Sequence, residues 1–362
     1  MTLRLPSPAR AAPPVQWLAL IACSWAGAAI LGAVGFPAAV LLAPALVATA
    51  FGVGGATIAV HAVPHRLAQG VAGVLIAQYL DSGMLASVAE HWLVFAVFSA
   101  VTLAVSAAVG WIAGRLTDMP REEAVWGFLP GMAASMIAMS HEQGLDSRYV
   151  AFLQFTRLLM VILVMTCVAA LLVPGLAERM VPGSGIATDP GLAGVLVTLL
   201  AAGTALIADR VVPFLPGGQS LLPMAAAVLA SSGLGLPLAL PQWLLMVAFF
   251  VVGVDVGLRF QPALLRHVAR ILPAMVLASL VLMALCSVSG LILARLLGIP
   301  PLTAVLATVP GSVETVALIA IHTQSDVTFV MTLQVLRMAA VLLAGPVLAR
   351  LICARLERPS GV

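Results

Sequence analysis

Two pairs of polar residues interrupt long apolar stretches of this chain. Gln154 and Arg157 lie in the stretch that begins at Tyr149, and Gln334 and Arg337 lie in a similar stretch near the C-terminus. The i, i+3 spacing puts the two side chains of each pair on one helix face. An arginine deep in a bilayer costs at least about 2.5–3.5 kcal/mol and therefore needs polar partners or water. Each pair could bind an anion, or it could lock helices together through carbonyls or carboxylates. Both interpretations stay open.

A Pro-Gly dipeptide precedes each pair. Proline removes a main-chain donor and glycine loosens the backbone, so each helix should be interrupted there. A helix that starts at such a break directs free N–H groups and its positive dipole end into the protein. Transporters build solute sites from breaks of this kind near the middle of the membrane, and the nearby arginines would favour an anion. The predicted substrate-binding residues are Pro130, Gly131, Gln154, Arg157, Pro310, Gly311, Gln334 and Arg337.

Two carboxylates are candidates for coupling transport to an ion. Glu314 follows the second Pro-Gly dipeptide, where the first half has Ala134. It could accept a proton or a sodium ion, or it could form a structural ion pair with one of the arginines. Asp255 lies in the apolar sequence VVGVDVG. It could also couple an ion, or it could mark the end of a span close to Arg259.

The composition predicts a helical membrane protein. Of the 362 residues, 62% are hydrophobic and only 9% are charged, whereas soluble domains carry about 25% charged residues. Residues 11–60 and 211–254 contain no charged residue and no histidine. Each run is long enough for two crossings of about 20 residues. The apolar runs are unbroken rather than alternating, so we expect an all-α polytopic protein and not a barrel.

The chain also contains an internal duplication. Shifted by 180 residues, 110–161 aligns without a gap with 290–341, and 15 of these 52 positions are identical. The identities include both Pro-Gly dipeptides and both Gln–Arg pairs. We predict a first membrane repeat at 15–175 and a second at 190–352, with a linker at 176–189 and terminal tails at 1–14 and 353–362.

The distribution of arginines favours one topology. Each half has about five apolar segments, plus one interrupted segment near 123–140 or 303–321. If the interrupted segments are re-entrant, the second repeat is inverted relative to the first and both termini are cytoplasmic. Most arginines outside the spans then also fall on the cytoplasmic side, as the positive-inside rule requires.

Several functions lack any sequence signal. There is no phosphate-binding loop and no dinucleotide fingerprint. The net charge of +3 is spread between spans and gives no basic face for direct nucleic-acid binding. The six histidines do not cluster, and the four cysteines are expected to be small buried hydrophobic residues. We therefore predict no metal site, no cofactor and no enzymatic activity.

The pattern PG-x14-D-x7-Q-x2-R occurs at 130–157 and again at 310–337, with LLAP at 41–44 and LLP at 221–223. Both copies of this pattern resemble the AbrB-duplication family of bacterial inner-membrane proteins. In LLAP and LLP, Ala43 and Leu222 replace the glycine of the family's Leu-Leu-Gly-Pro segments. The resemblance implies a multi-pass inner-membrane location and a label as a regulator of gene expression or as an ammonia monooxygenase. No copper ligands are evident, and the loops are too short to hold a DNA-binding domain.

Two functions remain as hypotheses. The first is a secondary transporter of a small solute, with an anion as the class that the arginines suggest. The alternative is a membrane protein involved in regulation of gene expression, acting through a partner or a metabolite. Under either hypothesis the chain contacts the lipid bilayer, and the sequence leaves a homo-oligomer open.

Overall fold

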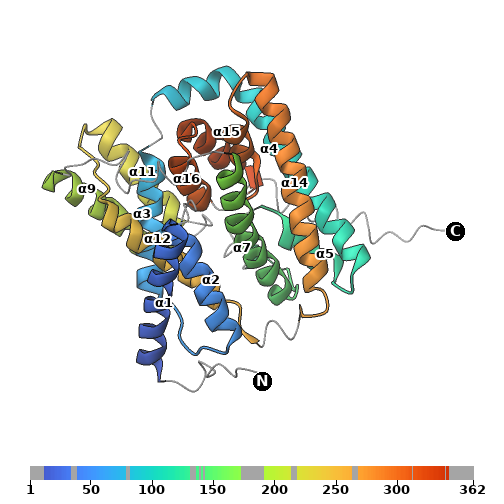
Figure 1. Cartoon of the computed structure of the whole chain (residues 1–362). Helices are drawn as coiled ribbons and strands as arrows, with labels where there is room; N and C mark the ends of the chain where they lie inside the picture. The colour runs from blue at the N-terminus through green and yellow to red at the C-terminus, as the bar shows by residue number, and fades with distance from the viewer. Residues whose placement is uncertain are drawn as a thin grey trace. The chain divides into compact units, whose positions relative to one another are not determined.

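The computed structural model describes residues 12–33, 39–78, 82–130, 136–137, 140–141, 143–172, 191–212, 218–262, 268–311, 313–338 and 340–341, without the side chains of 82–90, 170–172, 314 and 322. Within these ranges every regular element is a helix and none is a strand (Figure 1). The all-α prediction is therefore confirmed for the described part of the chain. The predicted tails and linker lie mostly outside these ranges.

Contacts divide the chain into two compact units, and each unit contains segments from both sequence halves. Unit 1 comprises 1–81, 162–266 and 317–324, and unit 2 comprises 82–161, 267–316 and 325–362. The division therefore does not follow the predicted repeats at 15–175 and 190–352. The boundaries of the repeats are properties of the sequence and stay a prediction.

Unit 1 is built around close helix pairs. Its helices are α1 (Pro13–Ala33), α2 (Ala39–Val53), α3 (Ala62–Ala77), α9 (Leu192–Gly203), α10 (Ala208–Val211), α11 (Gly218–Val228) and α12 (Gln242–Leu258), with a 3-10 turn at Thr204–Leu206 and a π-helical turn at Leu229–Gly233. α12 packs on α2, and α11 packs on α3. A Cβ atom at Gly257 would lie 2.5 Å from the carbonyl oxygen of Ala45, so only glycine allows α12 to approach α2 so closely. At the other side of α2, Gln16 of α1 exchanges two hydrogen bonds with Thr57.

Unit 2 holds the interrupted segments. Its elements are α4 (Ser82–Leu116), α5 (Arg121–Phe128), α7 (Ser147–Leu172) as far as Val161, α14 (Leu272–Leu297), α15 (Pro301–Thr308), the start of α16 (Val313–His322) and the helix Val327–Met338. α4 has a kink at His91. α4 packs on α5 and on α14, and α14 packs on α15.

Two glycines of unit 2 make equivalent close contacts in the two sequence halves. A Cβ at Gly110 of α4 would lie 2.8 Å from the carbonyl oxygen of Ala124 in α5. A Cβ at Gly290 of α14 would lie 2.8 Å from the carbonyl oxygen of Ala304 in α15. The offset of 180 residues that relates the two sequences also relates these two contacts.

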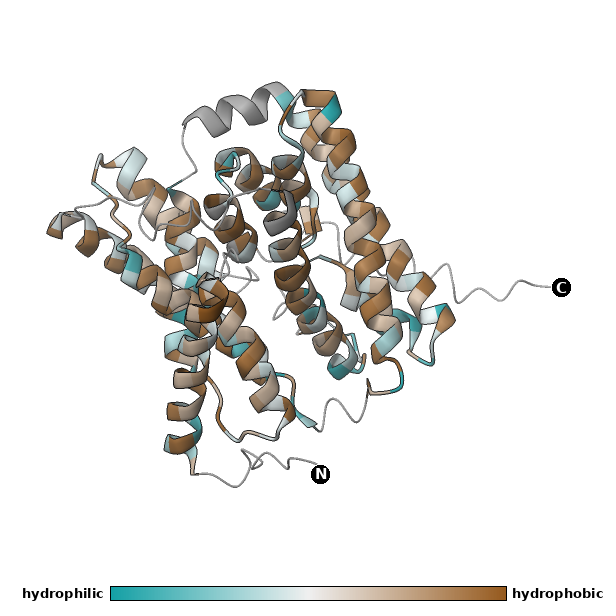
Figure 2. Cartoon of the chain, viewed as in Figure 1, coloured by the Kyte–Doolittle hydropathy of each residue, from teal (hydrophilic) through white to brown (hydrophobic). Residues whose placement is uncertain are grey.

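Within the described ranges, four helices are long and apolar enough to cross a membrane: Pro13–Ala33, His91–Leu116, Ser147–Ala169 and Leu272–Leu297. Hydrophobic residues follow α14 along most of its length (Figure 2). Only 33% of its most apolar window is buried inside the protein, and such an apolar surface suits lipid. The helices Ala39–Val53, Leu192–Leu206, Gln242–Leu258 and Val327–Met338 are apolar but shorter. The membrane-helix character is therefore supported, and the predicted ten crossings stay a prediction.

Candidate functional site

The candidate site lies in unit 2, where α5 and α15 end. α5 ends at Phe128, two residues before Pro130, and α15 ends at Thr308, two residues before Pro310. In an uninterrupted helix the N–H of residue 130 would bond to the carbonyl of Trp126, and that of residue 310 to the carbonyl of Leu306. Proline lacks this N–H, so both helices end with carbonyls that need other donors. We call the segment at Pro130 the first break and the segment at Pro310-Gly311 the second break.

Gln154 and Arg157 of α7 supply donors at the first break. Gln154 Nε2 donates to the carbonyl oxygens of Trp126, at 3.3 Å, and Leu129, at 3.1 Å. Arg157 Nη1 donates to those of Phe128, at 3.2 Å, and Leu129, at 2.9 Å. Arg157 Nη2 also donates to Gln154 Oε1 at 2.7 Å, which ties the two side chains together. The amide of Gln154 thus takes the place of the N–H that Pro130 lacks.

Gln334 and Arg337 do the same at the second break. Gln334 Nε2 donates to the carbonyl oxygens of Leu306, at 2.8 Å, and Val309, at 3.1 Å. Arg337 Nη1 donates to that of Val309 at 2.7 Å, and Nη2 donates to that of Gly311 at 3.2 Å and to Gln334 Oε1. Positive guanidinium groups near the negative C-terminal ends of α5 and α15 also agree with the direction of the helix dipoles.

All four side chains are buried, and neither guanidinium has its full set of partners. Gln154 and Gln334 are 0% exposed, Arg157 is 2% exposed and Arg337 is 3% exposed. Among the described residues neither Nε atom has a hydrogen-bond partner. No described carboxylate lies within ion-pair distance of either arginine. Among the described residues, each guanidinium is therefore buried against main-chain carbonyls and one glutamine amide oxygen.

The two breaks lie close together within unit 2. A Cβ at Gly311 would lie 2.8 Å from Cγ1 of Val161, which is one helical turn after Arg157 in α7. The Thr308 hydroxyl donates to the carbonyl of Cys286 in α14 at 2.9 Å. The sequence grouped both arginines in one predicted solute site, and within unit 2 the second break lies against the helix that carries Arg157.

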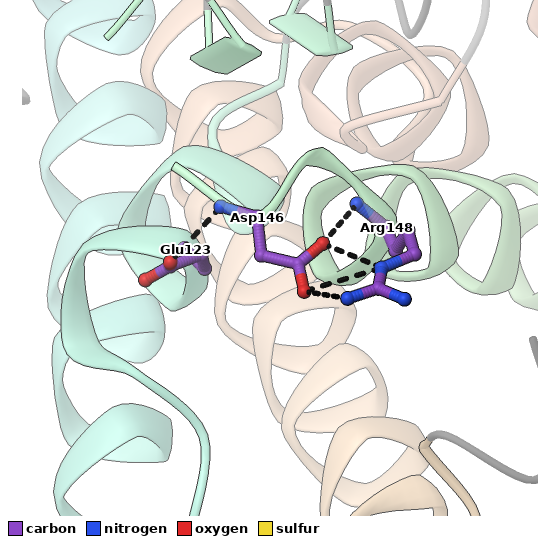
Figure 3. A network of polar contacts seen from close by, with 3 residues as sticks. All are labelled: Glu123, Asp146 and Arg148. Atoms are coloured by element: carbon purple, nitrogen blue, oxygen red, sulfur yellow. Dashed lines mark hydrogen bonds and ion pairs between the residues drawn. The ribbon is translucent and has the colours of Figure 1, made fainter. Parts of the chain in front are cut away.

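The start of each long helix after a break is also fixed in a repeated way. The Asp146 N–H donates to Glu123 Oε1 at 3.2 Å, and the Asp146 carboxylate accepts from the N–H of Arg148 and from its guanidinium (Figure 3). The Asp326 N–H donates to Thr303 Oγ1, and Asp326 Oδ1 accepts from the Phe329 N–H at 2.9 Å. Both aspartates therefore cap their helices.

The remaining candidate residues differ in what the structure says of them. Asp255 accepts two hydrogen bonds from Arg259, and His65 Nδ1 lies 3.4 Å from the same carboxylate oxygen. This ion pair fits the interpretation of Asp255 as the end of a span, although its predicted role in ion coupling remains untested. Gly131 and the side chain of Glu314 lie outside the described part.

The described cysteines and acidic groups give no metal centre. Cys286 is buried, but Cys23 and Cys167 are exposed, so the expectation of burial is wrong for these two. They lie on apolar helices whose outer faces contact lipid if the chain spans a membrane. No group of three histidine, cysteine or acidic residues that could hold a metal ion occurs among the described residues.

The sequence left carbonyls open as partners of the Gln–Arg pairs, but it missed which carbonyls these are. The prediction stressed the free N–H groups after each Pro-Gly dipeptide, whereas the Gln–Arg pairs bind the carbonyls before it. The signal was available, because a proline four residues after an otherwise helical residue always leaves that residue's carbonyl without its usual donor. A buried glutamine and arginine are among the few side chains that can donate several hydrogen bonds to such carbonyls.

The fold and site define a helical protein of membrane type, with two proline-broken helices held by buried Gln–Arg pairs. The sequence matches the family described as "Transition state regulatory protein AbrB" over residues 44–353, and the chain therefore belongs to the AbrB family. It is 35% identical over 342 residues to "Putative regulator AbrB" of Escherichia coli (strain K12), covering 94% of this chain and 97% of that protein. It is 26% identical over 303 residues to "Uncharacterized protein YhjN" of Bacillus subtilis (strain 168), covering 79% of this chain and 78% of that protein. No solved structure matches.

Proposed function

We propose that this chain is a secondary transporter of a small solute in the bacterial inner membrane, and that the solute binds between the two breaks. The observation that carries the proposal is the pairing itself: two interrupted segments, related by the internal duplication, lie in one unit, and Gly311 of the second break lies against α7, whose Arg157 holds the first break. Irregular backbone at membrane depth is tolerated where it is enclosed by protein or lines a cavity. Transporters commonly place their solute sites at such broken helices.

The proposal extends to topology. Five crossings and one re-entrant segment in each half would make the second repeat inverted, with both termini cytoplasmic and the linker 176–189 on the outer side. The proposed protein has no enzymatic activity and no cofactor, and the proposal applies to a homo-oligomer as well as to a single chain.

Reporter fusions test this topology. Alkaline phosphatase inserted in the linker should be active, because it folds only outside the cytoplasm, and a fluorescent protein at the C-terminus should fluoresce. The reverse pattern at either position would exclude the proposed arrangement.

Reconstitution tests the transport function. Proteoliposomes containing the purified protein would be loaded with a small-metabolite extract, and mass spectrometry would measure which solutes leave faster than from protein-free vesicles. Arg148→Ala is a matched control, because Arg148 lies on the same helix as Arg157 but has an exposed side chain paired with Asp146. A solute that leaves through the wild type and through this control, but not through Arg157→Lys, supports the proposal. No selective loss of any solute contradicts it.

A regulatory role is the second candidate, and the name of the Escherichia coli relative favours it. Such a role would act through a partner or through the level of a transported metabolite. Deletion of the gene followed by restoration with a transport-deficient variant separates the two. Restored expression patterns without transport would support a partner, and failure to restore them would support a metabolite.

A further inference from the structure

The two arginines carry a charge that the described residues do not neutralise. Each guanidinium is at least 97% buried, each is bonded to main-chain carbonyls, and no described carboxylate pairs with either. Burial of a charge is costly unless it is paired, and two like charges that interact raise that cost. Carbonyl dipoles reduce the cost but leave a net positive charge.

Each guanidinium also keeps a donor available. Arg157 uses Nη1 and Nη2 on the first break, and Arg337 uses Nη1 and Nη2 on the second, so Nε is the unpartnered donor in both. An unmet buried N–H is destabilising, and charge-assisted hydrogen bonds to a carboxylate are about twice as strong as neutral ones. A carboxylate offers two acceptor oxygens, and therefore suits two such donors.

The surroundings of the second break are apolar. The contact of Val161 with Gly311 brings a branched aliphatic side chain to this point, and Val316 of α16 lies against the same glycine. Both valines are buried. An inorganic anion gains nothing from such groups, whereas the hydrocarbon part of an organic anion does.

We propose that the Nε–H groups of Arg157 and Arg337 form a binding site for a small organic monocarboxylate. The inference rests on the proposed transport function for its biological role, but it concerns binding alone. The arginines are closed off from the surface in this structure, so the ligand enters when the unit opens.

Cys286 provides a reporter for this site. It is buried, and its main-chain carbonyl accepts a hydrogen bond from Thr308 beside the second break. In a variant in which Cys23, Cys167 and Cys353 are replaced by alanine, the rate of Cys286 modification by N-ethylmaleimide in detergent would be measured with butyrate, with the uncharged analogue butyramide, and with chloride. We expect butyrate to slow modification at least several-fold with a saturable dependence, and butyramide and chloride to leave it unchanged.

A second thiol separates local protection from general stabilisation. Ala48→Cys in unit 1, with Cys286 also replaced by alanine, places a buried thiol away from the two breaks along the chain. Butyrate should leave its modification rate unchanged. Equal slowing at both thiols, equal protection by chloride, or no protection by butyrate would each overturn the monocarboxylate site.

Flux measurements distinguish failure of this inference from failure of the proposed function. If butyrate protects Cys286 from modification but does not cross the membrane of the proteoliposomes, the binding site is supported and the transport function is contradicted. If a neutral or cationic solute crosses the membrane and butyrate does not protect Cys286, the transport function is supported and the monocarboxylate site is overturned. Neither result depends on a variant of the arginines, whose truncation is expected to destabilise the fold.

Discussion

At the first break Arg157 donates to the carbonyls of Phe128 and Leu129, whereas at the second break Arg337 donates to those of Val309 and Gly311. Leu129 and Val309 are equivalent under the duplication, and the second acceptors are not. Arg157 therefore holds only the end of α5 among the described residues, while Arg337 joins the end of α15 to Gly311, which lies two residues before the start of α16. The bonds to Leu129 and Val309 supply donors to carbonyls at the two helix ends that proline interrupts. The additional bond to Gly311 means that the Arg337 guanidinium binds carbonyls on both sides of Pro310.

The residues around the breaks differ more than the Gln–Arg pairs do. Glu123 accepts the Asp146 N–H in the first half, and Thr303 accepts the Asp326 N–H in the second. Ser106 is the counterpart of Cys286 at the same offset. Different side chains can meet a single acceptor requirement, whereas few side chains donate three or more hydrogen bonds to buried carbonyls. The glutamine and arginine therefore recur in both halves, whereas the position that needs only one acceptor holds Glu123 in one half and Thr303 in the other.

The largest expected effect comes from truncating either arginine. Arg157→Ala removes the guanidinium donor from the Phe128 carbonyl and from Gln154 Oε1, whereas the Leu129 carbonyl keeps Gln154 Nε2. Each unmet buried acceptor costs about 1–3 kcal/mol, so we expect a loss of about 2–6 kcal/mol in unfolding free energy. Arg337→Ala should lose a similar amount. Thermal unfolding in detergent measures both, with exposed Arg148→Ala as the control. A loss below about 1 kcal/mol would show that the carbonyl bonds do not hold the breaks.

The next effect tests how closely α5 approaches α7. A Cβ at Gly127 would lie 2.2 Å from Leu153 Cδ1, while the equivalent position in the second half is Ala307 and already carries a methyl group. Gly127→Ala should destabilise by about 1–3 kcal/mol through overpacking. In a Leu153→Gly background, which also removes the Leu153 Cβ that would lie 2.7 Å from the new atom, the same change should cost much less. An equal cost in both backgrounds would mean that the clash is relieved elsewhere.

A smaller effect tests whether glutamine substitutes for the missing N–H. Gln154→Leu leaves the Trp126 carbonyl without its side-chain donor, and we expect a loss of about 1–3 kcal/mol. Pro130→Ala restores a main-chain N–H at the position that would serve this carbonyl. The double-mutant cycle should therefore show a favourable coupling of about 1 kcal/mol. The cycle with Pro310→Ala and Gln334→Leu should give the same sign, and additive losses would argue against the substitution.

The smallest expected loss of stability is for an exposed ion pair in unit 1, in contrast to the buried bonds at the two breaks. Arg66 and Asp209 form an ion pair at 2.6 Å, but their side chains are 32% and 50% exposed. Asp209→Asn should cost no more than about 1 kcal/mol, because exposed ion pairs are weakened by solvent and entropy. The loss should shrink further as salt rises. A loss as large as that of Arg157→Ala would mean that surface charge, and not burial, controls stability.

Much of the site followed from the order of residues alone. The apolar runs, the duplication, the two Pro-Gly dipeptides and the i, i+3 placement of each glutamine and arginine are local or periodic properties. Such properties survive any arrangement of the helices, so the all-α class and the recurrence of the Gln–Arg pair could be predicted. The capping roles of Asp146 and Asp326 are likewise local, since each accepts an N–H within three residues.

The partners of the arginines were decided only by the tertiary structure. The sequence by itself determined that two guanidinium groups are buried near two helix breaks, but it left carbonyls, carboxylates and a solute as alternative partners. Arg157 meets carbonyls 28 and 29 residues earlier in the chain, and Val161 meets Gly311 of the other half. These contacts depend on how α5, α7 and α15 pack, because side-chain periodicity specifies which face of a helix is polar and not which distant backbone it will meet.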